Sequence, residues 1–303
     1  MSISTKVVFN RKTMEQVTES RRKPIVVGIG ELLWDMLPSG KRLGGPINFV
    51  YHASCLGAEG YAISAVGDDE LGKEIVDELD KNHIQHLIEK VPYPTGTVQV
   101  ELREGIPTYT IHERVAWDHI SPTSDAIDLA EKADAICFGT LAQRSRQSRE
   151  TIQAISSFAP KDAYRLLDIN LRQRYYDKEL IEESLYLANV LKVNDEEFNV
   201  LRDLFGLNGT EREVALWFIE KYGLRMFVLT AGSSIVRFIR ERRSLRCPRR
   251  RSRCGYVGAG DAFSGALIIS LLKGKSLSEA HHFAVKTAAF VCTKEGAWPV
   301  YEE

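Results

Sequence analysis

The chain has 303 residues, of which 44% are hydrophobic and 27% are charged, a composition typical of a globular protein that buries a substantial core. Forty Lys and Arg residues oppose 41 Asp and Glu residues, so the formal charge of -1 excludes a global field that recruits nucleic acid or an anionic membrane. We expect a loose leader over residues 1–23 and a single α/β domain over residues 24–303.

The cysteines and the amino terminus indicate the compartment. The five cysteines are odd in number and none forms a C-x-x-C pair, which favours a reducing environment over a disulfide framework. Residues 1–23 carry many charges and lack the apolar core of a signal peptide. No apolar run reaches the ~18 residues that a membrane span requires. We therefore expect a cytoplasmic protein with no membrane partner and no nucleic-acid partner.

Short apolar runs rich in β-branched residues recur along the chain and predict strands that are buried on both faces. From residue 126 onward, amphipathic stretches of helical length separate these runs. This βαβ pattern predicts a mostly parallel central sheet flanked by helices. The predicted strands cover residues 25–29, 61–66, 135–139, 166–169, 190–193 and 226–230.

A different pattern occupies residues 97–111. Residues 97–102 and 108–111 alternate between polar and apolar side chains, and a turn at Gly105 to Pro107 separates them. Alternation implies one solvated face, so this hairpin is expected to project from the sheet. We interpret residues 91–118 as a small β lid over a cleft, with a plain edge hairpin as the alternative.

The carboxyl-terminal part contains the sequence Gly258-Ala259-Gly260-Asp261 directly before an apolar stretch of helical length, residues 262–272. Glycines at a helix start allow close approach of the backbone to a ligand, and the unpaired amides there attract negative charge. A polyphosphate is the expected ligand, with Asp261 as the base that accepts a proton from an attacking hydroxyl. Its reference pKa is about 4, so it would be ionised at neutral pH. The alternative is that Asp261 simply caps the helix.

Polar residues follow three of the predicted strands. Asn194 and Glu197 follow residues 190–193 and supply oxygen ligands of the kind that bind magnesium, usually through water, although Asn194 also fits a plain helix cap. The sequence Thr230-Ala231-Gly232 lies at the carboxyl end of another strand, where open α/β sheets bind ligands.

The third polar loop, residues 168–172, follows the strand predicted over residues 166–169. Arg172 in this loop has the geometry to hold an anionic phosphate through two hydrogen bonds. The alternative for each of these segments is an ordinary polar loop.

Rival nucleotide motifs are incomplete. The sequence Gly28-Ile29-Gly30 lacks the third glycine of the dinucleotide fingerprint, because Leu33 stands at that position. The sequence Gly274-Lys275-Ser276 resembles the end of a P-loop but lacks its leading glycine. The seven histidines form no metal-ligand pattern, which argues against a catalytic zinc.

Taken together, these motifs resemble the ribokinase-like (PfkB) carbohydrate kinases over residues 24–300, and most closely the fructokinases. Residues 257–263 are similar to the family's closing signature, in which the aspartate is the general base, so the resemblance implies that role for Asp261 beside Gly258, Ala259 and Gly260. Residues 194–197 are similar to the family's N-x-x-E element, which implies that Asn194 and Glu197 act on magnesium and phosphate. The resemblance also implies a set of nucleotide contacts: Asn170, Asn194, Thr230, Gly232, Gly258 and Gly260.

The amino-terminal half carries the sugar side of the resemblance. Residues 30–38 resemble the fructokinase opening, in which the aspartate binds sugar hydroxyls, so Asp35 is the counterpart. A carboxylate can accept two hydrogen bonds from neighbouring hydroxyls. Residues 44–48 resemble the family's glycine motif, and residues 94–97 also read like a fructokinase. The sugar contacts implied are Asp35, Gly44, Gly45, Asn48, Thr97 and Arg172.

The sequence departs from the family at two places. The glycine motif lacks one residue between Gly45 and Pro46, and one deletion rotates a following helix by about 100° or shifts the loop. The arginine-rich residues 235–256 replace alternating apolar strands that in the family help to form the site for a monovalent cation (K⁺) and one wall of the nucleotide pocket. Because this interval shows no periodicity, we hypothesise a pair of compensating frameshifts.

These observations predict an ATP-dependent, magnesium-requiring sugar kinase whose substrate is D-fructose. Ribose, 2-keto-3-deoxygluconate or adenosine are alternative substrates in the same fold. A catalytically impaired protein that binds sugar or nucleotide is a second alternative, and a nucleic-acid binder that uses the arginine cluster is a third. The resemblance allows a homodimer joined through the lid.

Overall fold

The computed structural model describes residues 22–37, 40–103, 106–231, 235–240, 243–248, 258–294 and 296–301. Most of the leader predicted over residues 1–23, and Gly232 among the predicted site residues, therefore lie outside the described part of the chain. Within these ranges no helix is both long enough and apolar enough to cross a membrane.

The described residues form a central sheet of nine strands in the order β13-β12-β11-β10-β9-β8-β1-β4-β5. The seven strands from β11 to β5 are all parallel, which confirms the predicted architecture. Strand β5 lies at one edge and was not predicted, because its half-buried residues do not form an apolar run. The strands are β1 (Ile25–Ile29), β4 (Glu59–Gly67), β5 (Gln85–Val91), β8 (Ala135–Phe138), β9 (Tyr164–Asp168), β10 (Val190–Asn194), β11 (Met226–Ala231), β12 (Ile235–Arg240) and β13 (Arg243–Pro248).

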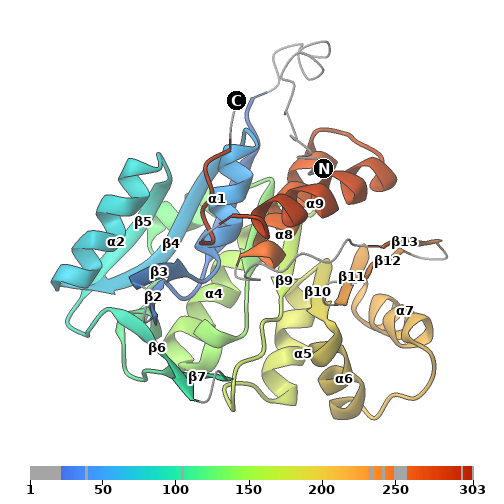
Figure 1. Cartoon of the computed structure of the whole chain (residues 1–303), viewed down its shortest axis with the longest axis horizontal. Helices are drawn as coiled ribbons and strands as arrows, with labels where there is room; N and C mark the ends of the chain where they lie inside the picture. Colours follow the sequence, from blue (N-terminus) through green and yellow to red (C-terminus); the bar gives the residue numbers. More distant parts are fainter. Residues whose placement is uncertain are drawn as a thin grey trace, which may run out of the picture.

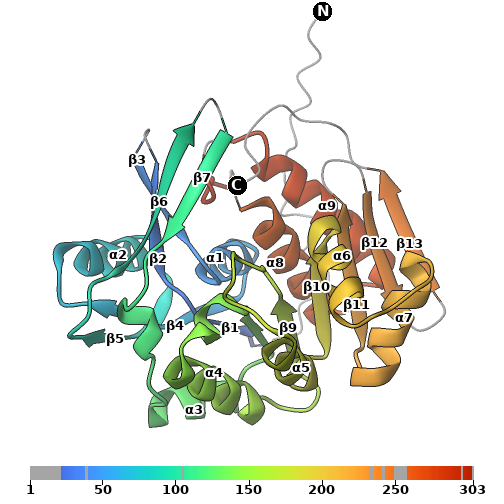
Figure 2. The same ribbon diagram turned by 90° about the horizontal axis from the view of Figure 1, so that it is seen from below.

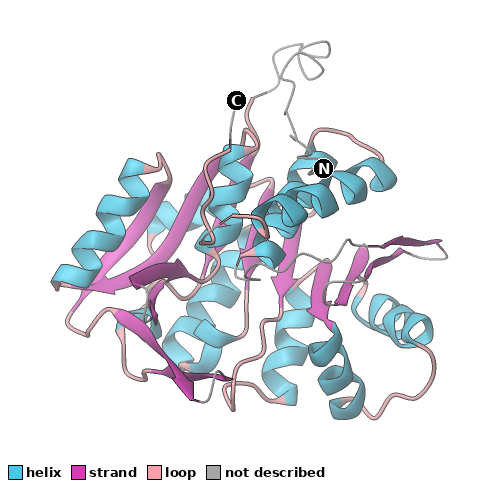
Figure 3. Ribbon diagram, viewed as in Figure 1, coloured by secondary structure: helices cyan, strands magenta, loops and turns pink. Residues whose placement is uncertain are grey.

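Helices cover both faces of this sheet and create two apolar cores (Figures 1 and 3). Successive residues of a strand point to opposite faces, so Phe227 belongs to one core while Val228 belongs to the other. One face carries α1 (Ile47–Cys55), α2 (Glu70–Lys81), α8 (Ala259–Leu272) and α9 (Leu277–Val291). The other carries α3 (Ser124–Ala130), α4 (Arg146–Phe158), α5 (Lys178–Leu187), α6 (Asp195–Leu204) and α7 (Glu211–Tyr222).

A second, four-stranded sheet contains the predicted hairpin, which projects beyond the central sheet (Figure 2). Its order is β3-β2-β6-β7, where β6 (Gly96–Arg103) and β7 (Ile106–Ile111) are the antiparallel hairpin. Strands β2 (Leu33–Leu37) and β3 (Gly40–Gly44) were not predicted, because each is only five residues long and neither alternates cleanly. The small sheet is therefore twice as wide as the sequence indicated.

The arginine-rich interval contributes two strands to the central sheet, although its sequence shows no periodicity. Strand β12 pairs antiparallel with β11, and β13 pairs antiparallel with β12. A ladder requires only backbone N–H and C=O groups, which arginine supplies as well as any other residue. Residues 249–257 lie outside the described part of the chain, and the hypothesis of compensating frameshifts stays untested.

Candidate active site

The predicted site residues converge at the carboxyl ends of the parallel strands. Strands β1, β9, β10 and β11 end at this edge of the sheet, where open α/β folds bind their ligands. The register places Asn194 at the end of β10 directly beside Thr230 on β11. Chain segments that are distant in sequence therefore supply one site.

Helix α8 begins at this edge. Gly258 is its N-cap residue, with φ of 79° and ψ of -8°, and no side chain caps the helix. Asp261 is not the N-cap residue of α8, as the alternative interpretation had it, because Gly258 holds that position and Asp261 is the third residue of the first turn. A Cβ atom on Gly258 would lie 2.7 Å from the Cβ of Ala297, so both the backbone angle and the space require glycine. The first amides of α8 have no partner within the helix and provide an anion site.

A buried ion pair lies beneath this helix start. Lys192 is the one charged residue of strand β10, and its Nζ atom donates to Oδ2 of Asp168 on β9. A Cβ on Gly260 would lie 3.2 Å from the same Nζ atom, so the ammonium group lies directly under the glycine backbone. Burial acts to lower the pKa of Lys192, but the charges of Asp168 and Asp261 raise it above its ordinary value. The lysine therefore carries a positive charge beside the predicted phosphate site.

Asp261 is a stronger base than its reference pKa suggested. Burial and the neighbouring charge of Asp168 raise the pKa of Asp261 to about 6, against the opposing effects of Lys192, Asn48 and Arg172. Its Oδ2 atom accepts a hydrogen bond of 3.2 Å from Nδ2 of Asn48. At neutral pH the carboxyl group is still largely ionised, and it is better matched to proton acceptance than a carboxyl of pKa 4.

The shortened glycine motif does not turn Asn48 away. Helix α1 begins at Ile47, and the backbone N–H of Asn48 donates to the carbonyl of Gly45 at 3.1 Å. The Oδ1 atom of Asn48 accepts a hydrogen bond of 2.8 Å from the indole Nε1 of Trp298. The expected rotation or shift does not separate Asn48 from Asp261, because the loop and the indole hold the side chain in place.

Two glycines bring the small sheet close to the site. At Gly45, where φ is 103°, a Cβ would overlap the carbonyl oxygen of Glu31. At Gly44 a Cβ would lie 3.1 Å from Oδ2 of Asp35, which lies on β2. Burial raises the pKa of Asp35, and Arg172 and Arg42 oppose this effect. Asp35, Gly44 and Gly45 are therefore neighbours, and their contact with a sugar stays a prediction.

Glu31 is a buried carboxyl that the sequence analysis did not single out. It follows β1, is 3% exposed, and its Oε2 atom has no hydrogen-bond partner among the described residues. Burial raises the pKa of Glu31 to about 7, although its own backbone amide and the Arg172 charge act to lower it, and the Asp261 charge raises it further. The signal in the sequence was a charged residue directly after an apolar strand.

Asn194 and Glu197 form a reciprocal cap at the start of α6. Oδ1 of Asn194 accepts from the Glu197 N–H, and Oε2 of Glu197 accepts from the Asn194 N–H, both at 2.8 Å. Oε1 of Glu197 also accepts from the Leu171 N–H at 3.1 Å. The capping alternative is therefore present, and no group of three or more His, Cys, Asp or Glu residues in the described ranges could hold a metal ion.

Arg172 lies among the carboxyl groups of the site. Its charge acts to lower the pKa of each of four of them: Glu31, Asp35, Glu197 and Asp261. Asn170, two residues earlier, has a φ of 43°, a left-handed conformation that asparagine tolerates better than most residues. The loop after β9 therefore places a cation near these carboxyl groups, and its contact with substrate stays a prediction.

Thr97 is not brought to Asp35. On β6, Thr97 pairs with Trp34, whereas Asp35 pairs with Val98. Adjacent residues of a strand point to opposite faces, so Thr97 and Asp35 lie on different faces of the small sheet. The hydroxyl of Thr97 lies 2.7 Å from Nδ1 of His112. The structure thus separates these two predicted sugar contacts.

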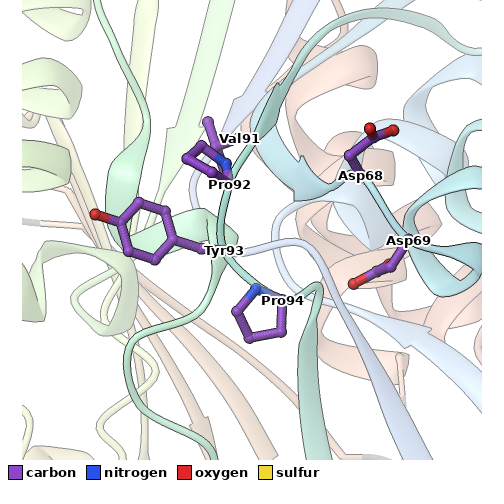
Figure 4. Close-up of a pocket in the computed structure, with 6 residues that line it drawn as sticks. All are labelled: Asp68, Asp69, Val91, Pro92, Tyr93 and Pro94. Atoms are coloured by element: carbon purple, nitrogen blue, oxygen red, sulfur yellow. The ribbon is translucent and has the colours of Figure 1, made fainter.

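A surface hollow of about 240 Å³ lies beside the loop that leads into β6 (Figure 4). The ring of Tyr93 points away from the carboxyl groups of Asp68 and Asp69, and it stacks on His119 with 3.5 Å between ring centroids. None of the predicted site residues lines this hollow, so we do not assign it to the candidate active site.

Comparison with known proteins gives a consistent result. A family model described as pfkB family carbohydrate kinase matches residues 40–302. A putative sugar kinase of Pyrococcus horikoshii is 28% identical over 90% of this chain and 92% of its own length. The crystal structure of that protein in complex with ATP superposes with a TM-score of 0.76. The superposition covers 90% of this chain and 94% of that one, at 26% identity. A probable fructokinase-5 of Arabidopsis thaliana is 28% identical over 91% of this chain and 94% of its own length. A 5-dehydro-2-deoxygluconokinase of Bacillus cereus is 24% identical over 83% and 80% of the two chains.

Proposed function

Because the chain belongs to the PfkB family of carbohydrate kinases and is therefore a sugar kinase, we propose that it transfers the γ-phosphoryl group of ATP to a hydroxyl of D-fructose. The observation that carries this proposal is the position of Asp261. Its carboxyl group lies between the unpaired amides at the start of α8 and the side chain of Asn48 on α1. A base in that place faces a phosphate site on one side and a sugar site on the other.

The chemistry requires one proton transfer and one phosphoryl transfer. As the sugar oxygen attacks the γ-phosphorus, Asp261 accepts the hydroxyl proton, the bond from phosphorus to the bridging oxygen breaks, and ADP leaves with the bonding electrons. The pKa of about 6 leaves Asp261 ionised at neutral pH, when it can act as a base. The α8 amides and the charges of Lys192 and Arg172 favour the negative charge that accumulates on the phosphates.

The residues present fit ATP and magnesium in different ways. Gly258 and Gly260 let the start of α8 pack closely on Ala297 and on the Lys192 ammonium, and the first backbone amides of the helix suit a phosphate. The oxygens of Asn194 and Glu197 already accept backbone N–H groups, so they fit magnesium through bridging water. Magnesium supplies neutralisation of phosphate charge when it is bound. On the sugar side, Asp35 and the free donor of Asn48 suit a polyhydroxylated substrate.

The fructokinase relative and the fructokinase-like motifs around Asp35 and Asn48 favour fructose as the substrate. A coupled assay with fructose, ribose, 2-keto-3-deoxygluconate and adenosine, run with and without potassium, tests this. We expect the highest kcat/KM with fructose and a loss of about 10²- to 10⁴-fold in Asp261→Asn. Asp128→Asn, an exposed residue on α3, is the matched control. Turnover of none of these substrates, or full activity in Asp261→Asn, contradicts the proposed mechanism. A preference for another sugar contradicts fructose alone.

A further inference from the structure

The last described segment, residues 296–301, lies against both sides of the site. Ala297 packs on Gly258 at the start of α8, so closely that Gly258 has no room for a Cβ. The next residue, Trp298, donates its indole N–H to Oδ1 of Asn48 at 2.8 Å. Figure 1 shows this segment running beside α1. The carboxyl-terminal segment therefore links the helix that presents Asp261 to the helix that presents Asn48.

The indole fixes which way the amide of Asn48 points. An indole N–H is only a donor, so the oxygen of the amide must face Trp298. The amide nitrogen then faces Asp261, where it donates to Oδ2 at 3.2 Å. One hydrogen of that NH₂ group is used on Asp261, and the second stays available for a sugar hydroxyl. With a flipped amide, two acceptors would face each other and the bond to Asp261 would be lost.

The ring of Trp298 is itself held in place by α1. It stacks on Tyr51, with 4.5 Å between ring centroids and an angle of 6° between the planes. The hydroxyl of Tyr51 donates to the carbonyl of Pro299 at 2.9 Å, which anchors the chain beside the indole. A half-buried ring with a second anchor has little freedom to turn its N–H away from Asn48.

We propose that Trp298 is a positioning residue that acts through Asn48 to orient the catalytic base Asp261. The inference rests on the proposed function only for the role of Asp261 as the base. The hydrogen bonds that link Trp298, Asn48 and Asp261 do not depend on that function. The motifs around residue 261 do not reveal this positioning role, because the indole donor of Trp298 and its acceptor on Asn48 lie 250 positions apart in the sequence.

The expected consequence concerns the ionisation of Asp261. A hydrogen bond donated to a carboxylate favours its charged form, and the bond from Asn48 acts to lower the pKa of Asp261 against burial and the charge of Asp168. Loss of the bond therefore raises that pKa. The other groups that influence Asp261 come from β8, β9, β10 and the loops after β1 and β9, and they remain in place in the variant: Cys137, Asp168, Lys192, Glu31 and Arg172.

The test replaces Trp298 by Phe, which keeps an aromatic ring to stack on Tyr51 and removes the N–H donor. We expect the acid limb of kcat/KM to move up by about one pH unit, which lowers activity about fivefold at about pH 6 and leaves it nearly unchanged at about pH 8.5. Trp217→Phe on α7 is the matched control and keeps the wild-type profile. An unchanged acid limb in a folded Trp298→Phe variant overturns the inference.

A second measurement is independent of turnover. In protein labelled with ¹³C at aspartate carboxyl groups, and assigned with the Asp261→Asn variant, the Asp261 titration midpoint moves up in Trp298→Phe. Adding Trp298→Phe to Asn48→Ala moves it no further, because both changes remove the same bond. If the wild-type protein phosphorylates no sugar but the Asp261 midpoint moves in Trp298→Phe, the proposed function fails and the positioning role of Trp298 stands. If the midpoint does not move, only the positioning role is refuted.

If Trp298→Phe does not fold, the wild-type protein provides the result. Its Trp298 indole ¹H–¹⁵N resonance should titrate with a midpoint near that of Asp261, about 6, because Asn48 couples the two groups. A resonance that does not respond between about pH 5 and 8 contradicts the coupling.

Discussion

The two sides of the proposed site are built by different physical means. The sugar side, comprising Glu31, Asp35, Gly44, Gly45 and Asn48, is held by close backbone packing and contains a buried carboxyl with an unpartnered oxygen. The phosphate side, comprising Asp168, Lys192, Gly258, Gly260 and Asp261, contains two carboxyl groups around a buried ammonium. Both sides require glycine, but Gly45 faces a backbone carbonyl while Gly260 faces a charge. Substitutions on the sugar side should therefore lower stability through steric strain, and substitutions on the phosphate side should lower it through loss of charge balance.

Removal of the buried ammonium tests the phosphate side and has the largest expected effect. Lys192→Met keeps a similar volume but leaves the charges of Asp168 and Asp261 without their buried partner. We expect the free energy of unfolding at about pH 8 to fall by about 3–5 kcal/mol. The deficit should shrink as the pH falls and the carboxyl groups become protonated, because the uncompensated charge then disappears. Urea unfolding at several pH values measures this effect.

The control for this change is an exposed ion pair. Lys90 and Asp68 lie 3.5 Å apart with side chains that are 60% and 80% exposed, so Lys90→Met should change stability by less than about 0.5 kcal/mol. The double variant Lys192→Met with Asp168→Leu should recover much of the loss, since it removes the buried charge along with its partner. Equal effects of Lys192→Met and Lys90→Met contradict the buried-charge interpretation.

Sequence alone predicted that polar residues converge at one edge of the central sheet. Parallel strands place their carboxyl ends together, so the polar residues after residues 166–169, 190–193 and 226–230 were expected to converge, and Asn194 and Thr230 are register partners. Lys192 was missed because one lysine in an apolar strand carries no signal of what lies above it. Only the packing of α8 on β10 brings its Nζ atom under Gly260.

The contacts that a local motif does not reveal depend on distant parts of the chain. The missing residue in the glycine motif was expected to rotate the following helix or shift the loop, and in the structure Asn48 contacts Asp261 and Trp298, which lie 213 and 250 positions further along the chain. Thr97 was assigned to the sugar by resemblance, while the pairing of β2 with β6 places it on the other face from Asp35. Strand register is set by the whole sheet, so a local motif does not determine which face a side chain occupies.

Steric strain on the sugar side is tested by a pair of glycines that both have positive φ. In Gly45→Ala the new Cβ overlaps the carbonyl of Glu31, whereas a Cβ on Gly40, at the start of β3 with φ of 128°, would meet no atom of the described residues within 4 Å. We expect Gly45→Ala to lower the free energy of unfolding by about 3 kcal/mol, the sum of backbone strain and overpacking. Gly40→Ala should lose about 1 kcal/mol, from backbone strain alone. Similar losses in the two variants, measured by urea unfolding, would show that packing against Glu31 contributes little.

The smallest expected effect concerns the unbalanced carboxyl group of the sugar side. The pKa of Glu31 rises from 4.5 to about 7 on folding, so the protonated carboxyl group stabilises the folded protein. This contribution to stability is fully present below about pH 4.5 and is lost as the pH rises through about 7. Glu31→Gln removes that dependence. Between about pH 5 and 8 the variant should gain about 2 kcal/mol relative to wild type, with exposed Glu131→Gln as the control that gains nothing. If the difference in the free energy of unfolding between wild type and Glu31→Gln stays constant across this pH range, the charge of Glu31 is balanced in the folded protein. Charge balance would then stabilise both sides of the proposed site.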